Sequence, residues 1–197
     1  MNRIARRLSA TAVALTLAGA LAACSDSTAG TPSAAPTSTS SAPSTASNQT
    51  ARAGDVMFAQ MMIPHHQQAI EMADIALAKT SASQQVRDLA TEIKAAQDPE
   101  ITTMEGWLQV WGVSGAPATM DHGSGGMMTK NEMDALKAAE GAEFDRQWVS
   151  LMIKHHEGAV TMAEQVLTTT QNPEVKALAE AVVKTQTEEI ARMKAMS

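Results

Sequence analysis

The sequence has one cysteine and few aromatic residues. Because Cys24 is the only cysteine, the chain forms no internal disulfide and offers no thiolate pair for a metal or redox site. It contains three tryptophans, two phenylalanines and no tyrosine, against 14 methionines. Methionine is an adaptable core residue and also a soft metal ligand, so both roles must be considered.

The sequence also lacks an excess of positive charge. It has 15 Lys and Arg against 21 Asp and Glu, a net charge of −6, which argues against nucleic acid as a partner. The His-Glu-x-x-His of zinc proteases, a glycine-rich phosphate loop and the Glu-x-x-His pairs of di-iron bundles are missing. We therefore expect a protein that is not an enzyme.

The N-terminus is typical of a secretory signal. Residues 1–7 hold three arginines and no acid, and an apolar segment follows to Ala23. The sequence Leu21-Ala22-Ala23-Cys24 resembles the lipobox of bacterial lipoproteins. We expect residues 1–23 to be removed and Cys24 to carry a lipid that anchors an extracytoplasmic protein to the cell membrane. An ordinary signal peptide with an unrelated cysteine and an uncleaved anchor remain as alternatives.

The rest of the chain divides by composition. Residues 24–51 are almost entirely Ser, Thr, Ala, Pro and Gly, a composition that buries too little apolar surface to offset the entropy of ordering. We expect them to form a disordered stalk. Residues 52–197 have the length of a single ordinary domain.

This domain contains an internal repeat. Residues 58–80 align with residues 148–170 at an offset of 90, and the alignment continues at an offset of 89 as far as residues 104 and 193. In both halves apolar residues recur at three- and four-residue steps, which is typical of helices. The sequence predicts an all-α four-helix bundle made of two helical hairpins, each covering the apolar face of the other.

Capping residues mark the helix ends. The four helices are predicted to begin near Asp55, at Ser81 or Ser83, after Thr129 and at Asn172. The first helix is predicted to end near Lys79. The third is predicted to continue past Gly141 and to end near Thr169. Ser81 and Gln84 have the spacing of a capping box, as do Thr129 and Glu132, and Asn172-Pro173 is a cap followed by a first helical residue.

Two prolines distinguish the halves. Pro64 and Pro99 lie inside the first and second helices, where each removes a backbone hydrogen bond and favours a kink. Their counterparts, Lys154 and Glu188, are ordinary helix formers. We expect halves that are similar but not superposable.

Each repeat carries one apolar stripe with a histidine in it. The stripes are Phe58, Met62, His65, Ala69, Met72 and Ala76, and Trp148, Met152, His155, Ala159, Met162 and Val166. Helices turn such stripes toward their partners, so His65 and His155 should point inward and meet near the core, related by an approximate two-fold axis. His66 and His156 lie about 100° further round the helix, so we expect them at the stripe's edge.

Imidazole nitrogens and thioether sulfurs together favour copper, Cu(I) in particular. The candidate ligands are Met62, His65, His66, Met72, Met152, His155, His156 and Met162. For any single methionine core packing is the better explanation, whereas two His-His pairs at matching positions favour a metal role. For His66 and His156 a structural role is an equal alternative.

Two carboxylates are candidates for supporting this site. Glu100 and Glu189 occupy matching positions on the second helix of each hairpin, on one face with Gln97 and Met104, or with Gln186 and Met193. A carboxylate facing a ligand histidine accepts its other N–H and fixes its tautomer. Solvent-exposed charges at the edge of the bundle are an equal alternative.

The connection between the halves, residues 112–128, is rich in glycine and small residues and is predicted to be a mobile loop. It holds a second set of candidate copper ligands, which are Met120, His122, Met127 and Met128. Because ordering such a loop costs backbone entropy, we expect the helical residues to form the tighter site and the loop a weaker acquisition site.

These residues resemble the domain-of-unknown-function family 305. The resemblance covers about residues 55–196 and rests on two motifs, the segment from Met62-Ile63-Pro64-His65-His66 to Met72-Ala73, and Phe144-Asp145-Arg146-Gln147-Trp148 leading to Met152-Ile153-Lys154-His155-His156 and Met162-Ala163. It implies a secreted protein with a ferritin-like helical bundle, and copper binding and tolerance as in some members. The Met/His-rich loop resembles the variable insertion of such proteins.

Together these features predict an extracytoplasmic copper-binding protein that sequesters Cu(I) or passes it to a partner protein. Two alternatives belong to other functional classes of protein. A four-helix bundle can hold haem between an axial Met and His, and an interaction module would use the histidines for packing alone.

Overall fold

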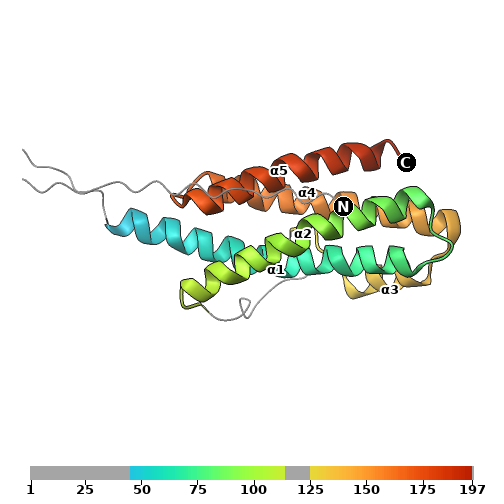
Figure 1. Cartoon of the computed structure of the whole chain (residues 1–197), viewed down its shortest axis with the longest axis horizontal. Coiled ribbons are helices and arrows are strands. Elements are labelled where there is room, and N and C mark those ends of the chain that lie inside the picture. The colour runs from blue at the N-terminus through green and yellow to red at the C-terminus, as the bar shows by residue number, and fades with distance from the viewer. Residues whose placement is uncertain (1–44, 114–124, 197) are drawn as a thin grey trace, which may run out of the picture. The chain divides into compact units, whose positions relative to one another are not determined.

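The computed structural model describes residues 45–113 and 125–196, and the described part is helical without strands (Figure 1). Its five helices are α1 (Thr45–Ala78), α2 (Gln84–Val110), α3 (Lys130–Ala138), α4 (Gly141–Leu167) and α5 (Pro173–Lys194). Helices α1 and α2 form one hairpin and α4 and α5 the other, as the repeat predicts. No helix in the described ranges is long and apolar enough to cross a membrane.

The two hairpins meet mainly through α1 and α4, which run antiparallel. At one end, the backbone N–H of Ser83, after the α1–α2 turn, donates to Asp145 near the start of α4 (3.1 Å). At the other end, Gly54 of α1 lies beside Thr169, just after α4. Equivalent helices therefore face each other in opposite directions, the arrangement that an approximate two-fold axis requires.

Three of the four predicted helix starts are confirmed, and the first is wrong. Thr129 and Glu132 form the capping box of α3, Asn172 caps α5, and Ser83 caps α2 by accepting from the Val86 N–H. Ser81 is not a cap, because its hydroxyl donates to Glu140 of the other hairpin. The sequence predicts a stalk through residue 51, whereas α1 begins at Thr45; residues 45–53 contain no proline or glycine, so an adjoining packed helix can extend through them.

The prediction of one continuous helix past Gly141 is wrong. The chain leaves α3 at Ala139, Glu140 is extended, and Gly141 has a φ of 57°, which favours glycine. The break is fixed by the α1–α2 turn, since Lys79 Nζ donates to the Lys137 carbonyl (2.8 Å) and to Glu140 (2.6 Å). Contacts between hairpins therefore override the local helix pattern.

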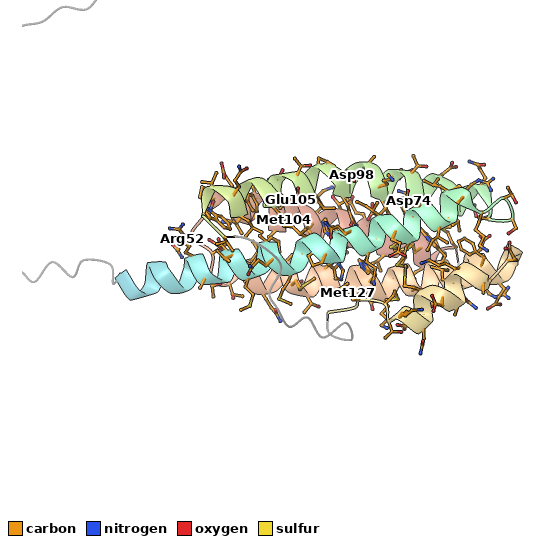
Figure 2. All side chains as sticks on the ribbon, turned by 90° about the horizontal axis from the view of Figure 1, so that it is seen from below. Arg52, Asp74, Asp98, Met104, Glu105 and Met127 are labelled. Carbon is orange, nitrogen blue, oxygen red and sulfur yellow. The ribbon has the colours of Figure 1, made fainter. Side chains whose placement is uncertain are left out.

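Both predicted stripes are buried. Trp148 on α4 also donates its indole N–H to the Met72 carbonyl on α1 (2.9 Å), which links the hairpins through their apolar faces. On α2, fully buried Met104 lies beside exposed Glu105, so one face of the helix turns inward (Figure 2). Helices α1 and α2 continue without interruption through Pro64 and Pro99.

Candidate metal centre

His65 and His155 contact each other in the centre of the bundle. Their ring centroids lie 3.7 Å apart with an interplanar angle of 37°, and each residue is 1% exposed. Helix α1 provides one ring and α4 the other, from equivalent positions of the repeat. The prediction that both rings point inward and meet is confirmed.

His66 and His156 are buried as well, contrary to the prediction that they lie at the stripe's edge. Both residues are 0% exposed. The second helix of each hairpin covers them: His66 Nε2 lies 2.7 Å from Glu100 Oε2 on α2, and His156 Nε2 lies 2.7 Å from Glu189 Oε2 on α5. A stripe on one helix could not reveal this cover.

The two glutamates therefore contact the second histidine of each pair. The side chain of Glu100 is 19% exposed and that of Glu189 is 8% exposed, so both are largely desolvated. Since a carboxylate only accepts, Nε2 of His66 and His156 carries the proton, and in the neutral ring Nδ1 is the free lone pair. Gln97 and Gln186, on the same helix faces, are also buried.

Several nitrogens of the four histidines are buried without a hydrogen bond of normal geometry among the described residues. They are Nδ1 of His65, His66, His155 and His156, and Nε2 of His155. The His65 carbonyl lies near the His155 ring and weakly raises the pKa of His155. It does not form a hydrogen bond of normal geometry with that ring. Buried polar atoms are normally paired, so these nitrogens are candidate metal ligands. Among the described residues no group of three or more His, Cys, Asp or Glu side chains is placed to hold a metal ion, so a metal bound here would also need methionine sulfurs.

Electrostatics keep the two central imidazoles uncharged. Burial, and then repulsion from His66, lowers the pKa of His65 to about 3. Burial, and then repulsion from His65, lowers the pKa of His155 well below its usual value. The neutral ring is the form that binds metals, so both side chains are ready to bind near neutral pH.

The candidate methionine ligands form two matched groups. The histidines of α1 and α4 separate two apolar clusters, one with Met62, Met104 and Met162 and the other with Met152, Met193 and Met72. These are equivalent residues of the two repeats. Each apolar cluster therefore contains one of two methionine groups that the repeat relates to each other.

The segment 125–128 breaks the symmetry of the site. His65 Nε2 donates to the Gly125 carbonyl (2.8 Å), whereas His155 has no such partner in the described part of the chain. The segment lies against Gly158 of α4, where an added β-carbon would sit 1.8 Å from the Gly125 carbonyl oxygen. Gly126 has a φ of 82° and its own β-carbon would meet the Lys154 carbonyl at 2.5 Å. Only glycine permits this approach.

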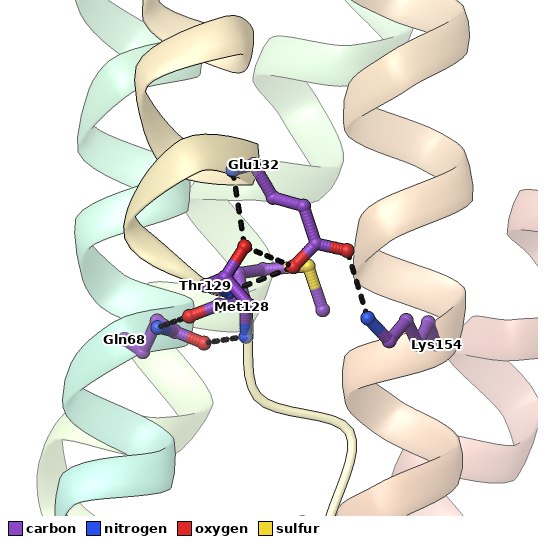
Figure 3. Close-up of polar contacts among 5 residues, drawn as sticks. All are labelled: Gln68, Met128, Thr129, Glu132 and Lys154. Atoms are coloured by element: carbon purple, nitrogen blue, oxygen red, sulfur yellow. Dashed lines mark hydrogen bonds and ion pairs between the residues drawn. The ribbon is translucent and has the colours of Figure 1, made fainter. Parts of the chain in front are cut away.

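Side chains from α1 and α4 hold the end of the same segment (Figure 3). Gln68 of α1 donates to the Met128 carbonyl (2.9 Å) and accepts from its N–H (2.6 Å). Lys154 of α4 pairs with Glu132 at 2.8 Å, next to the Thr129 cap. Residues 125–129 are thereby fixed between the two helices.

The prediction of a mobile loop is therefore wrong for residues 125–128. Met127 is 9% exposed and Met128 is 2% exposed, and Met128 packs in the same cluster as Met72 and Met152. Both sulfurs belong to the core because Gln68 and Gly158 draw the segment inward. Met120 and His122 lie outside the described residues.

Sequence reasoning missed Gln68, Gly125 and Gly158. The available signal was a difference between otherwise matching repeats, since Gln68 and Gly158 are equivalent positions with unlike residues. Pro64 and Lys154 are a second pair of this kind, and Lys154 also holds the connection between the hairpins. Unlike residues at equivalent positions mark where the halves play different roles.

The chain is similar to known proteins in both sequence and fold. Residues 55–197 match the model of a family described as a domain of unknown function, DUF305. CopM in its Cu(I)-bound form is 37% identical, with a TM-score of 0.62 over 72% of this chain and 94% of that chain. CopM has also been solved with Cu(II) and with silver bound.

Two further structures share the fold. A DUF305 fragment from Deinococcus radiodurans is 35% identical, with a TM-score of 0.67 over 73% of this chain and 94% of that one. A DUF305 protein from Streptomyces coelicolor is 32% identical, with a TM-score of 0.68 over 73% and 91%. Among curated proteins none matches the chain.

Proposed function

The chain belongs to the DUF305 family, and from this and its site we propose that it is a copper-binding protein that holds Cu(I) between α1 and α4. The observation that carries the proposal is the buried group of four histidines with unpaired Nδ1 atoms, set between two groups of methionines. Cu(I) suits imidazole and thioether ligands, and the copper- and silver-bound forms of CopM support the same class of ion.

The residues divide by role. His65 and His155 are the central ligands, because their rings already meet and are neutral. His66 and His156 offer Nδ1, held in one tautomer by Glu100 and Glu189. The thioether ligands are drawn from Met62, Met72, Met152 and Met162.

The two glutamates also offset the free-energy cost of burying a positively charged ion. A monovalent cation in an apolar core is unfavourable unless negative charge lies close to it. Glu100 and Glu189 are separated from the ion by a single imidazole each, so they offset its charge without acting as ligands. This arrangement suits a soft ion, which prefers nitrogen and sulfur to carboxylate oxygen.

The protein is proposed to store or transfer copper without catalysing a reaction. The resemblance of Leu21-Ala22-Ala23-Cys24 to a lipobox supports attachment to the outer side of the cell membrane through Cys24, which would place the bundle where exported copper is handled. Replacement of Cys24 by Ser should abolish fatty-acid labelling and membrane retention. Persistent labelling of that variant would contradict the anchor.

The contact between His65 and His155 speaks against haem between these two rings. A porphyrin held between these two histidines would have to separate them by the thickness of its ring, whereas their rings lie 3.7 Å apart. This contact does not bear on haem held between one histidine and a methionine, which absorption spectroscopy decides. A Soret band in protein purified from its native membrane would reverse this conclusion.

A Cu(I) competition titration tests the proposal. Three proteins are compared: the wild type, His65→Leu/His155→Leu, and the loop variant Met120→Ser/His122→Ser. The loop variant spares Met127 and Met128, which the structure places in the core. We expect the helical variant to lose the tightest binding and the loop variant to keep it, with circular dichroism confirming the fold of each. Loss of tight binding only in the loop variant would contradict the proposed site.

A further inference from the structure

A pocket of about 180 Å³ opens between α1 and the C-terminal part of α4, and three of its wall residues are methionines. Met57 and Met61 come from α1 and Met162 from α4. Gly54 and Phe58 complete the α1 side. The pocket thus presents uncharged thioethers at the surface.

Met57 is not explained by packing. It is 60% exposed, one of the few large apolar side chains in the described part of the chain that face solvent. An apolar residue so exposed contributes little hydrophobic stabilisation. The matching positions on α4 hold Gln147 and Leu151, so the repeat does not reproduce this pair of sulfurs at the other end of the bundle. The pair is specific to one end.

The two methionines are aligned with the central histidine. Met57, Met61 and His65 follow one another at four-residue steps, so they lie on one face of α1, about 6 Å apart along the axis. Exposure falls along this row, from 60% at Met57, through a half-buried Met61, to 1% at His65. The row runs from solvent to the metal centre.

Met162 connects the pocket with that centre from the opposite helix. It is 9% exposed, and its sulfur would lie 3.8 Å from a β-carbon on Gly125. The Gly125 carbonyl in turn accepts the His65 Nε2–H. One side chain therefore belongs both to the pocket wall and to the surroundings of His65.

We propose that Met57, Met61 and Met162 form a loading site for a soft monovalent cation, Cu(I) or Ag(I), which then moves inward to the histidines. This inference rests on the proposed function, since the loading site serves the same centre. Thioethers bind such ions without releasing a proton and hold them less firmly than a full imidazole set. Transfer is a ligand exchange in which the ion keeps its oxidation state. The net charge of −6 favours approach of cations.

The test separates the rate of loading from affinity. Met57→Leu/Met61→Leu removes both sulfurs at nearly constant volume. The matched control, Met133→Leu/Met196→Leu, removes two methionines that do not line this pocket. Stopped-flow transfer of Cu(I) from a coloured chelator gives the rate, and competition at equilibrium gives the affinity.

We expect the pocket variant to load about tenfold more slowly while its equilibrium affinity stays near that of the wild type, since loading acts on the association rate. The control should load at the wild-type rate. Loading of the pocket variant at the wild-type rate, with tight binding still dependent on His65 and His155, would overturn the loading site alone. If Cu(I) binding by the wild-type protein did not depend on the histidines, both the proposed function and the loading site would be overturned.

Discussion

Gln68 and Gly158 occupy equivalent positions in the two repeats and hold the same segment between α1 and α4. Gln68 binds the Met128 backbone by two hydrogen bonds, and Gly158 leaves space for the Gly125 carbonyl. Together they bring that carbonyl to His65 and make the two halves of the metal centre unequal. The first two predictions concern this pair.

Gly158→Ala should destabilise the fold by about 1–3 kcal/mol, the usual cost of overpacking. The new β-carbon would lie 1.8 Å from the Gly125 carbonyl oxygen, so the segment must move away from α4. Urea unfolding measures the change. Gly106→Ala is the control, because its β-carbon meets nothing within 4 Å and alanine should stabilise α2 by up to about 1 kcal/mol. Equal effects in both variants would show that the segment does not rest on Gly158.

Gln68→Ala should cost about 1–3 kcal/mol, since it leaves the N–H and carbonyl of Met128 without their partner. Hydrogen exchange at the Met128 amide should accelerate in parallel. Gln67→Ala, at the exposed neighbouring position, is expected to change neither quantity. Unchanged exchange at Met128 in the Gln68 variant would contradict this role.

Glu189→Gln should weaken Cu(I) binding about 10–100-fold, as changes beside a metal-bound histidine typically do. The amide keeps the shape of the carboxylate but loses the charge that offsets the ion and no longer dictates the His156 tautomer. The control is Glu188→Gln, since Glu188 pairs with exposed Lys184 instead. If both variants bind Cu(I) equally, the carboxylate at position 189 plays no part in binding.

The metal-free protein should lose stability below pH 6.5. The pKa of His65 falls from 6.5 in the unfolded chain to about 3 in the folded one, and that of His155 is also lowered. As the pH drops through this window, the unfolded chain takes up protons that the folded protein does not. The free energy of unfolding should therefore fall, by up to about 1.4 kcal/mol per pH unit for each such histidine.

Urea unfolding between pH 7.5 and 5 would measure how the free energy of unfolding changes with pH. This interval lies above the pH range in which most carboxylates titrate. His65→Leu/His155→Leu should flatten the profile, because both groups are then missing. A slope that persists unchanged in the double variant would assign the pH dependence to other residues.

The sequence by itself determined the helical class, the duplication and the inward direction of both stripes. These follow from local spacing, because a repeat of three and four residues fixes which side of a helix is apolar. The capping residues Thr129 and Asn172 marked two helix starts for the same reason, since a cap acts within one turn.

Only the tertiary structure decided the remainder. The break before Gly141, the burial of His66 and His156, and the insertion of residues 125–128 each depend on contacts between segments far apart in sequence, such as Lys79 with Glu140. Periodicity describes one helix at a time and does not reveal what covers its edge. The physical reason is that burial and hydrogen-bond pairing are properties of the assembled hairpins, and they override local helix preference wherever the hairpins meet.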